Sequence, residues 1–140
     1  MKLRQIMTDR VIRIHPEESV AVAARMLTQY NVGALPVCDS EGRLRGLVTD
    51  RDIVVRCLAA GMDPAATPIR SVMTTGLVCA EGNMSTADAA QLMARRQIRR
   101  LPVVEGTVLR GMVSLADLAG HPETAWDAAD ALEGISSNVR

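Results

Sequence analysis

The amino-acid sequence contains the same segment twice, and this internal repeat constrains the fold more than any other feature. The first part of the repeat recurs after 66 residues (position 7 to position 73) and the last part after 65 (position 44 to position 109). The matching segments are Met7-Thr8 with Met73-Thr74, Leu35-Pro36-Val37 with Leu101-Pro102-Val103, and Leu44-Arg45-Gly46 with Leu109-Arg110-Gly111. The offset changes in a Ser- and Gly-containing stretch that reads as a turn, where length changes are tolerated. Two copies of roughly 60 residues do not form a solenoid. They predict a pseudo-two-fold pair whose shared seam would hold a ligand or a partner.

Composition narrows the classes of function. The 16 basic and 16 acidic residues balance, so no global field attracts nucleic acid or an anionic membrane. The sequence has 48% hydrophobic residues but one Tyr, one Trp and no Phe, so aromatic platforms for stacking bases are lacking. Arginines at positions 25, 43 and 56 interrupt every apolar run that could approach the length of a spanning helix. No signal peptide is recognisable at the start. We expect a cytoplasmic protein that contacts neither nucleic acid nor a membrane.

The thiols and imidazoles form no recognisable site. Cys38, Cys57 and Cys79 are odd in number and match no metal-binding spacing, which favours free thiols in a reducing compartment. His15 and His121 are far apart in the sequence and neither has a nearby ligand-type residue at metal spacing. We predict no catalytic residue and no metal ligand.

Each copy shows the same order of local signals, which predicts a mixed α/β (α+β) fold with a β-α-β-β-α unit in each copy. Ser19 and Ser85 stand where helix N-caps belong, each before apolar residues at helical spacing. The expected strands are 11–14, 35–38 and a strand ending at 47–48 in the first copy, and 77–80, 101–104 and a strand ending at 112–113 in the second. The expected helices are 19–30 and one from 49, then 85–97 and one from 114. The expected domains are a first repeat at 6–61, a linker at 62–71, a second repeat at 72–120, and a tail at 121–140 with a short helix around 123–132.

The last expected strand of each copy is followed by a hydroxyl residue, and an acid comes three positions after that hydroxyl. The pairs are Thr49 with Asp52, and Ser114 with Asp117. One interpretation is structural, since a hydroxyl N-cap and an acid at the third helical position form a capping box. The other is functional, because a helix N-terminus favours phosphate and a carboxylate there can accept both hydroxyls of a ribose. The residues alone leave both interpretations open.

The two copies differ in front of the strand that contains the Leu-Pro-Val segment. Arg99 and Arg100 in the second copy replace Gly33 and Ala34 of the first. Large planar cations thus stand where the other copy has small residues, and this difference favours an anion site on one side of the seam.

These repeated motifs resemble a tandem pair of CBS (cystathionine-beta-synthase) domains over residues 6 to about 120. The Thr49–Ile53 and Ala59–Pro64 segments are further similar to small stand-alone bacterial CBS-pair proteins of the hypoxic-response type. The resemblance implies a cleft between the copies that holds adenosine nucleotides, with the acid of one repeat facing the strand entry of the other. The first implied pocket contains Thr49, Asp52, Arg99, Arg100 and the backbone around Val78. The second contains Ser114, Asp117, Val32, Gly33, Ala34 and the backbone around Ile12. The first is preferred because it combines a carboxylate for ribose with cations for phosphate.

The function implied by this resemblance is a regulatory module, not an enzyme. It would bind AMP, ADP or ATP, or else NAD or S-adenosylmethionine, require no cofactor, form a homodimer and signal to a separate effector protein. Two alternatives stay open: an interaction module with degenerate pockets, and a metal- or thiol-dependent enzyme.

Overall fold

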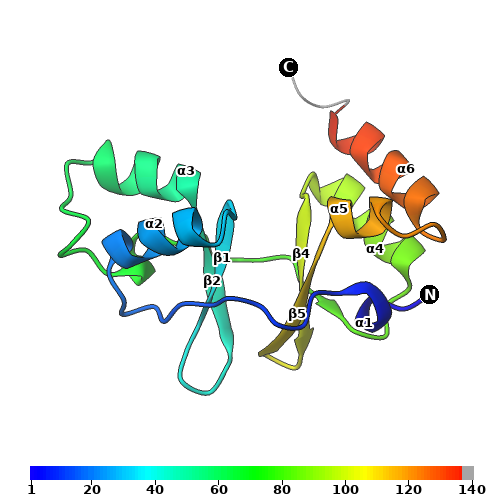
Figure 1. The fold of residues 1–140 in the computed structure, drawn as a ribbon, viewed down its shortest axis with the longest axis horizontal. Coiled ribbons are helices and arrows are strands. Elements are labelled where there is room, and N and C mark those ends of the chain that lie inside the picture. The colour runs from blue at the N-terminus through cyan, green and yellow to red at the C-terminus, as the bar shows by residue number, and fades with distance from the viewer. Residues whose placement is uncertain (137–140) are drawn as a thin grey trace. The chain divides into compact units, whose positions relative to one another are not determined.

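The computed structural model describes residues 1–136, and they form two compact units. Unit 2 contains Ile12–Leu77, and unit 1 combines Met1–Val11 with Val78–Arg140. Both are mixed helix-and-strand units, which confirms the predicted fold class (Figure 1). The end of the expected 121–140 tail, residues 137–140, lies outside the described residues.

Unit 2 packs helices against a two-stranded antiparallel sheet. Its elements are α2 (Val20–Gln29), β1 (Ala34–Cys38), β2 (Leu44–Thr49), α3 (Asp50–Asp52), the π-helical turn η1 (Ile53–Leu58) and the 3-10 turn η2 (Ile69–Ser71). The Ser19 hydroxyl caps α2 by accepting a hydrogen bond from the Val22 amide at 3.3 Å, as its position predicts. The core is aliphatic and includes Val20, Leu27, Leu35, Val37, Val48, Cys57, Ile69 and Val72.

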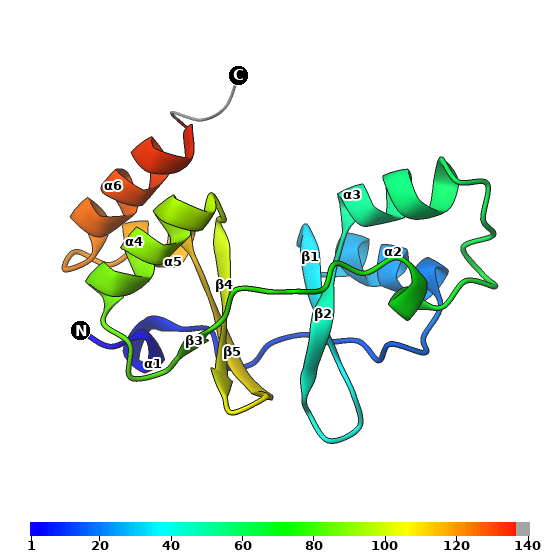
Figure 2. The ribbon, with the colours of Figure 1, turned by 180° about the vertical axis from the view of Figure 1, so that it is seen from behind.

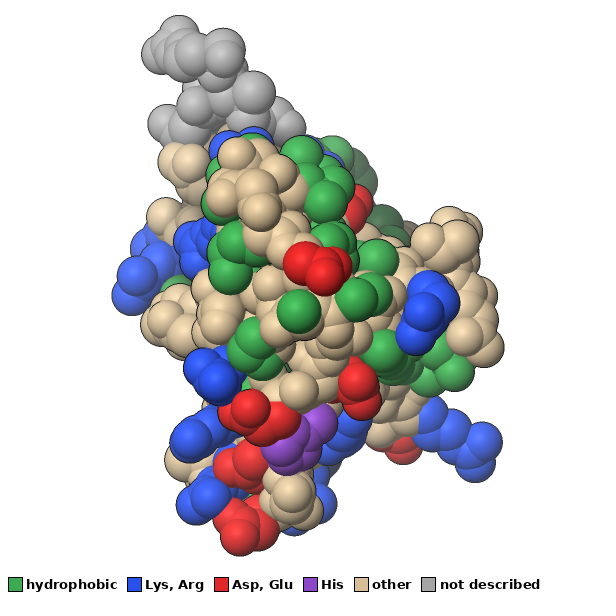
Figure 3. All heavy atoms as spheres, turned by 90° about the vertical axis from the view of Figure 1, so that its left-hand side faces the viewer, with side chains coloured by type: hydrophobic (Ala, Val, Ile, Leu, Met, Phe, Trp, Pro, Cys, Tyr) green, Lys and Arg blue, Asp and Glu red, His purple; other side chains and the backbone are tan. Residues whose placement is uncertain are grey.

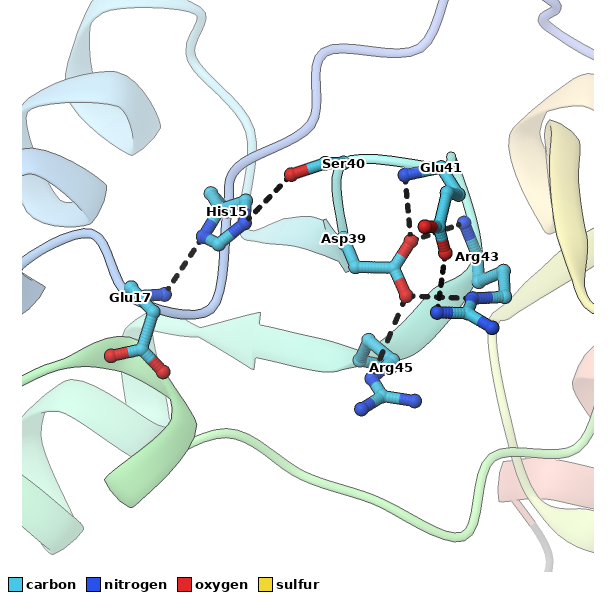
Figure 4. A network of polar contacts seen from close by, with 7 residues as sticks. All are labelled: His15, Glu17, Asp39, Ser40, Glu41, Arg43 and Arg45. Carbon is cyan, nitrogen blue, oxygen red and sulfur yellow. Dashed lines mark hydrogen bonds and ion pairs between the residues drawn. The ribbon is translucent and has the colours of Figure 1, made fainter.

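The β1–β2 hairpin of unit 2 is held at its turn by polar contacts (Figure 4). The Asp39 carboxylate accepts hydrogen bonds from the Glu41 and Arg43 amides at 3.0 Å and from Arg43 Nε at 2.8 Å. His15 Nδ1 accepts from the Glu17 amide at 3.1 Å, and His15 Nε2 lies 3.4 Å from a turn hydroxyl. His15 therefore has a structural role at this end of the hairpin.

Unit 1 repeats the plan with a three-stranded sheet. Its elements are α1 (Leu3–Ile6), β3 (Ala80–Glu81), α4 (Thr86–Arg96), β4 (Arg100–Glu105), β5 (Val108–Ser114), α5 (Leu115–Ala119) and α6 (Ala125–Ser136). Strand β4 pairs in parallel with β3 and antiparallel with β5. Helices α4, α5 and α6 pack together on the same unit (Figure 2). Its core includes Leu3, Met93, Leu101, Val103, Val113 and Leu118.

Two short segments, which we call straps, pack along the sheets. The strap of residues 2–8 packs in unit 1, and the strap of residues 68–74 packs in unit 2. Thr8 exchanges backbone hydrogen bonds with Met112, and Thr74 does the same with Leu47. A glycine makes each approach possible, because a Cβ on Gly46 would lie 2.6 Å from the Thr74 carbonyl oxygen. A Cβ on Gly111 would likewise lie 2.8 Å from the Thr8 carbonyl oxygen. The compact units are defined by contacts within the structure and not by the sequence repeat. The repeat boundaries at 6–61 and 72–120 therefore stay a prediction.

The structure corrects some expected elements. The strand expected at 11–14 is reduced to an isolated bridge of Ile14 with Val37, and the one expected at 77–80 becomes β3. The helix expected from Thr49 widens after Asp52 into a π-helical turn. Ile53 and Cys57 are the buried residues of this turn. Apolar periodicity could not distinguish this turn from an ordinary helix.

Candidate functional site

Each unit contains one hydroxyl–acid pair where its last strand runs into a helix, and both pairs form capping boxes. The Thr49 hydroxyl accepts from the Asp52 amide at 3.0 Å, and the Asp52 carboxylate accepts from the Thr49 amide at 3.0 Å. The corresponding distances for Ser114 and Asp117 are 3.1 and 2.8 Å. The structural interpretation is therefore correct for both pairs, and any ligand must use the acceptor capacity that remains.

Within each unit, the start of the strand that contains the Leu-Pro-Val segment (β1 or β4) lies beside the capping box of the same unit. Ala34 pairs with Thr49 across β1 and β2, and the Gly33 carbonyl accepts from the Asp50 amide at 3.2 Å. Arg100 pairs with Ser114 across β4 and β5 in the same way. Directly opposed residues of an antiparallel pair project their side chains from one face, about 5 Å apart at Cβ. The sheet of unit 1 thus brings Arg100 next to the Ser114 cap.

The Asp52 carboxylate is buried and well satisfied. Its side chain is 8% exposed, and the Thr74 hydroxyl of the strap lies 3.0 and 3.1 Å from its two oxygens. Arg56 Nε lies 3.8 Å from Oδ1, and Arg56 also donates to the Met73 carbonyl at 3.2 Å. A carboxylate has about four lone-pair sites, so contacts to the amide, hydroxyl and guanidinium leave Asp52 little capacity for a ligand.

The Asp117 carboxylate is the less occupied of the two. Its Oδ2 accepts from the Ser114 amide, and Oδ1 has no hydrogen-bond or ion-pair partner among residues 1–136. Thr8, the counterpart of Thr74, is exposed, and its hydroxyl makes no hydrogen bond within the same residues. The two acids are equivalent in the sequence but differ in how much of each carboxylate is available.

The other predicted site residues are exposed or half-buried. Arg99 and Arg100 are exposed, and neither guanidinium forms an ion pair with a described acid. Val78 is half-buried against the core of unit 1, while Ile12 and Val32 of unit 2 are 37% and 41% exposed. Both predicted pockets combine residues of unit 1 with residues of unit 2, so these groupings stay predictions.

Sequence reasoning missed Thr74 and Arg56 as partners of Asp52. The available signal was the Met-Thr dipeptide at the start of each copy, which was noted only as part of the repeat.

Comparison with known proteins agrees with this organisation. The model of the CBS domain matches residues 3–58 and again 69–124. The chain belongs to the CBS-domain family. The CBS domain-containing protein YhcV of Bacillus subtilis is 45% identical over 134 residues, which is 96% of this chain and 94% of that protein. Hypoxic response protein 1 of Mycobacterium tuberculosis is 37% identical over 123 residues, covering 87% and 86% of the two chains. The expected similarity to hypoxic-response CBS-pair proteins is confirmed.

Solved CBS-pair structures have the same fold. The crystal structure of Hypoxic Response Protein I with two coordinated zinc ions has a TM-score of 0.79 at 35% identity, covering 86% of this chain and 98% of that one. CBSX2 in complex with AMP has a TM-score of 0.75 at 26% identity, covering 85% and 93%. The CBS domain pair of MJ0100, in complex with 5′-methylthioadenosine and S-adenosyl-L-methionine, has a TM-score of 0.74 at 26% identity, covering 86% and 94%.

The CBS pair contains no group of three or more His, Cys, Asp or Glu side chains placed to hold a metal ion within the described residues. Burial raises the pKa of the Cys38 thiol, although Arg13 lowers it in part, and burial also raises that of Cys79. A raised pKa disfavours the reactive thiolate. In residues 1–136, we find no helix of the length and apolarity needed to cross a membrane.

Proposed function

We propose that this CBS pair is a regulatory module that binds an adenosine-containing nucleotide. The proposal rests on one observation: in unit 1, the acid of the Ser114 cap has an open oxygen, and Arg100, which forms no ion pair with a described acid, pairs with Ser114 across β4 and β5. An ionised carboxylate is a strong acceptor for ribose hydroxyls, and a guanidinium is suited to bidentate contacts with phosphate. Support comes from two neighbours of the same fold, which hold AMP in one case and methylthioadenosine with S-adenosylmethionine in the other.

The charge at the strand entries favours a phosphorylated ligand. Arg100 is opposite Ser114, and the Arg99 carbonyl accepts from the Leu115 amide at 3.1 Å, so the backbone of both arginines lies beside this cap. The corresponding positions of unit 2 hold Gly33 and Ala34 and offer no cation. AMP, ADP, ATP and NAD carry the phosphate that such cations recognise, whereas S-adenosylmethionine does not. We therefore propose a nucleotide phosphate as the ligand of the Arg99–Arg100 side.

Two carboxylates are candidates for the ribose-binding acid. The resemblance pairs Asp52 with Arg99 and Arg100, in a cleft between the repeats. The open Oδ1 of Asp117 favours that acid instead, because Asp52 already accepts from Thr49 and Thr74. Both assignments predict nucleotide binding and differ in which carboxylate is essential.

Isothermal titration calorimetry of nucleotide-stripped protein with AMP, ATP, NAD and S-adenosylmethionine tests the proposal. Asp117→Asn keeps a side-chain oxygen that can accept from Ser114 but removes the charge, and Asp52→Asn is its matched control. Loss of a charge-assisted hydrogen bond costs about 1.5–3 kcal/mol, so Asp117→Asn should weaken binding roughly 10- to 150-fold. A larger loss in Asp52→Asn would support the other acid. If the wild type gives no binding signal up to millimolar ligand, nucleotide binding is refuted. An interaction module with degenerate pockets would then remain.

We further propose that nucleotide occupancy is passed to a separate effector protein. A ligand changes such an interaction only by binding the effector-competent and incompetent states with different affinity. The effector is therefore best sought by comparing nucleotide-bound protein with the Asp117→Asn variant.

A further inference from the structure

Unit 1 contains a cleft of about 650 Å³ where β3 and β4 end and β5 begins. The Ser114 cap lies at the other end of β4 and β5, where Arg100 pairs with Ser114. Small-molecule pockets typically measure about 300–1,000 Å³, so the cleft is large enough for a small ligand and separate from the nucleotide site proposed above. It is lined by Arg4 and Met7 of the strap, the turn Glu81–Asn83, the strand end Val103–Glu105, and Arg110.

Four charged side chains line this cleft, and two of them have no partner. Arg110 Nε lies 2.9 Å from Glu105 Oε2, so these two charges satisfy each other. Arg4 and Glu81 are exposed, and they form no ion pair with each other or with any other side chain of residues 1–136. The four formal charges cancel, which disfavours a ligand of high net charge such as a polyphosphate. One cation and one carboxylate remain available to a ligand that has both charges.

The corresponding end of unit 2 uses the same cation for an internal ion pair. Arg70 occupies the place of Arg4, because each of these strap arginines donates its amide to the turn before the long helix, at 2.9 and 3.0 Å. Arg70 Nε lies 2.7 Å from Glu17 Oε1. Acidic and basic side chains likewise lie next to one another around the histidine in the lower part of Figure 3. In unit 1 the position of Glu17 is occupied by Asn83, and this exchange leaves Arg4 without its acid.

A glycine also keeps the cleft of unit 1 open. Gly82 stands where unit 2 has Pro16, and its φ is not positive, so the backbone does not require glycine here. A Cβ on Gly82 would lie 3.4 Å from the Arg4 Cβ and 3.9 Å from a Val103 methyl, which are ordinary contact distances. The absence of a side chain at this position therefore provides space between the strap and the sheet.

We propose that this cleft binds an apolar α-amino acid as its zwitterion. The ligand carboxylate accepts hydrogen bonds from the Arg4 guanidinium, and the ligand ammonium donates to the Glu81 carboxylate; both are charge-assisted contacts. Met7 and Val104 are half-buried in the cleft lining and offer an apolar surface to the ligand side chain. The proposal does not depend on nucleotide binding, because none of its residues belongs to the Ser114 or Thr49 cap.

Heteronuclear NMR of the full chain, titrated to millimolar concentration with L-leucine, L-methionine and L-valine, tests the proposal. Saturable shifts of the Gly82 and Asn83 amides are expected, with the Thr49 and Ser114 amides unchanged. Isocaproate lacks the ammonium of leucine, and leucinamide lacks its carboxylate. Each loses one charge-assisted contact and should bind roughly 10- to 150-fold more weakly than leucine.

Variants of the cleft identify the contacts. Arg4→Gln and Glu81→Gln each remove one charge and should weaken leucine binding roughly 10- to 150-fold. Arg70→Gln, at the corresponding position of unit 2, is the matched control and should leave binding unchanged. Asn83→Glu should give Arg4 the internal ion pair of unit 2, and Gly82→Leu should fill the cleft, so both should also weaken binding. Far-UV circular dichroism establishes that each variant is folded.

Three results would overturn the proposal. The first is the absence of saturable shifts with all three amino acids. The second is leucine binding that persists unchanged in both Arg4→Gln and Glu81→Gln. The third is binding of isocaproate or leucinamide as tight as that of leucine.

Discussion

The hydroxyl of Thr74 should contribute strongly to stability, whereas the hydroxyl of its repeat counterpart Thr8 should contribute almost nothing. Thr74 donates to a carboxylate that is 8% exposed, at 3.0 and 3.1 Å. Thr→Val replaces the hydroxyl by a methyl of similar size and keeps the β-branched shape that suits the backbone pairing with Leu47. The change removes a hydrogen bond to a charged group, which is worth about 1.5–3 kcal/mol, and leaves part of a buried carboxylate without a donor.

Thr8→Val is the matched control. Thr8 has the same kind of backbone pairing, with Met112, but it is exposed and its hydroxyl has no hydrogen-bond partner within residues 1–136. Surface changes of this type usually stay within about 0.5 kcal/mol. Urea unfolding followed by far-UV circular dichroism measures both variants. With a slope of about 2 kcal/mol per molar urea, Thr74→Val should lower the midpoint by roughly 0.7–1.5 M, and Thr8→Val by at most ~0.25 M.

A double-mutant cycle with Asp52→Asn identifies the source of the effect. If the Thr74 hydroxyl acts through the buried charge, its removal should cost at least ~1 kcal/mol less in the Asp52→Asn background than in the wild type. Equal midpoints for Thr74→Val and Thr8→Val, or full additivity with Asp52→Asn, would refute the reasoning.

Other predictions concern the straps, the hairpin and a thiol. Gly46→Ala and Gly111→Ala should each destabilise by about 1–3 kcal/mol, because the new Cβ meets a strap carbonyl at 2.6 or 2.8 Å; unchanged urea midpoints would contradict this. Burial raises the pKa of Asp39, but hydrogen bonds, chiefly from Arg43, outweigh it and lower the pKa below 3.8. The stabilising contribution of the ionised Asp39 carboxylate is therefore fully present above pH 3.8 and is lost as the pH falls through the lowered pKa of Asp39. Asp39→Asn should thus differ from wild type in thermal midpoint near neutral pH and converge with it in acid. The buried Cys38 thiol, whose pKa is raised, should react with iodoacetamide far more slowly in native protein than in urea at about pH 7.5, and equal rates would show that the thiol is accessible.

Much of the fold could be predicted from the sequence because its signals are local. The Ser19 and Ser85 hydroxyls each need only the amide three residues later, and both helices start where those serines indicate. The Thr49 and Ser114 capping boxes are equally local. The reduced strand near Ile14 and the π-helical turn after Asp52 depend on long-range pairing and packing, which a short apolar run does not specify.

The roles of the two acids show where a duplicated motif ceases to predict function. Asp52 and Asp117 each cap their own helix, so a comparison of the motifs alone gives them the same role. The difference between them comes from other parts of the chain. Thr74 of one strap donates to the Asp52 carboxylate, whereas Thr8 of the other strap makes no hydrogen bond to Asp117. Position i+4 supplies Arg56 in one copy and His121 in the other.

A carboxylate that is already saturated stabilises its unit, whereas one with an open oxygen keeps its capacity for a ligand. The Thr74→Val variant therefore bears on function as well as stability. It removes a hydroxyl from the Asp52 oxygens and increases their acceptor capacity. If Asp117 is the ribose-binding acid, this variant should lose stability and keep the wild-type nucleotide affinity. Tighter binding to Thr74→Val would instead assign the ribose to Asp52.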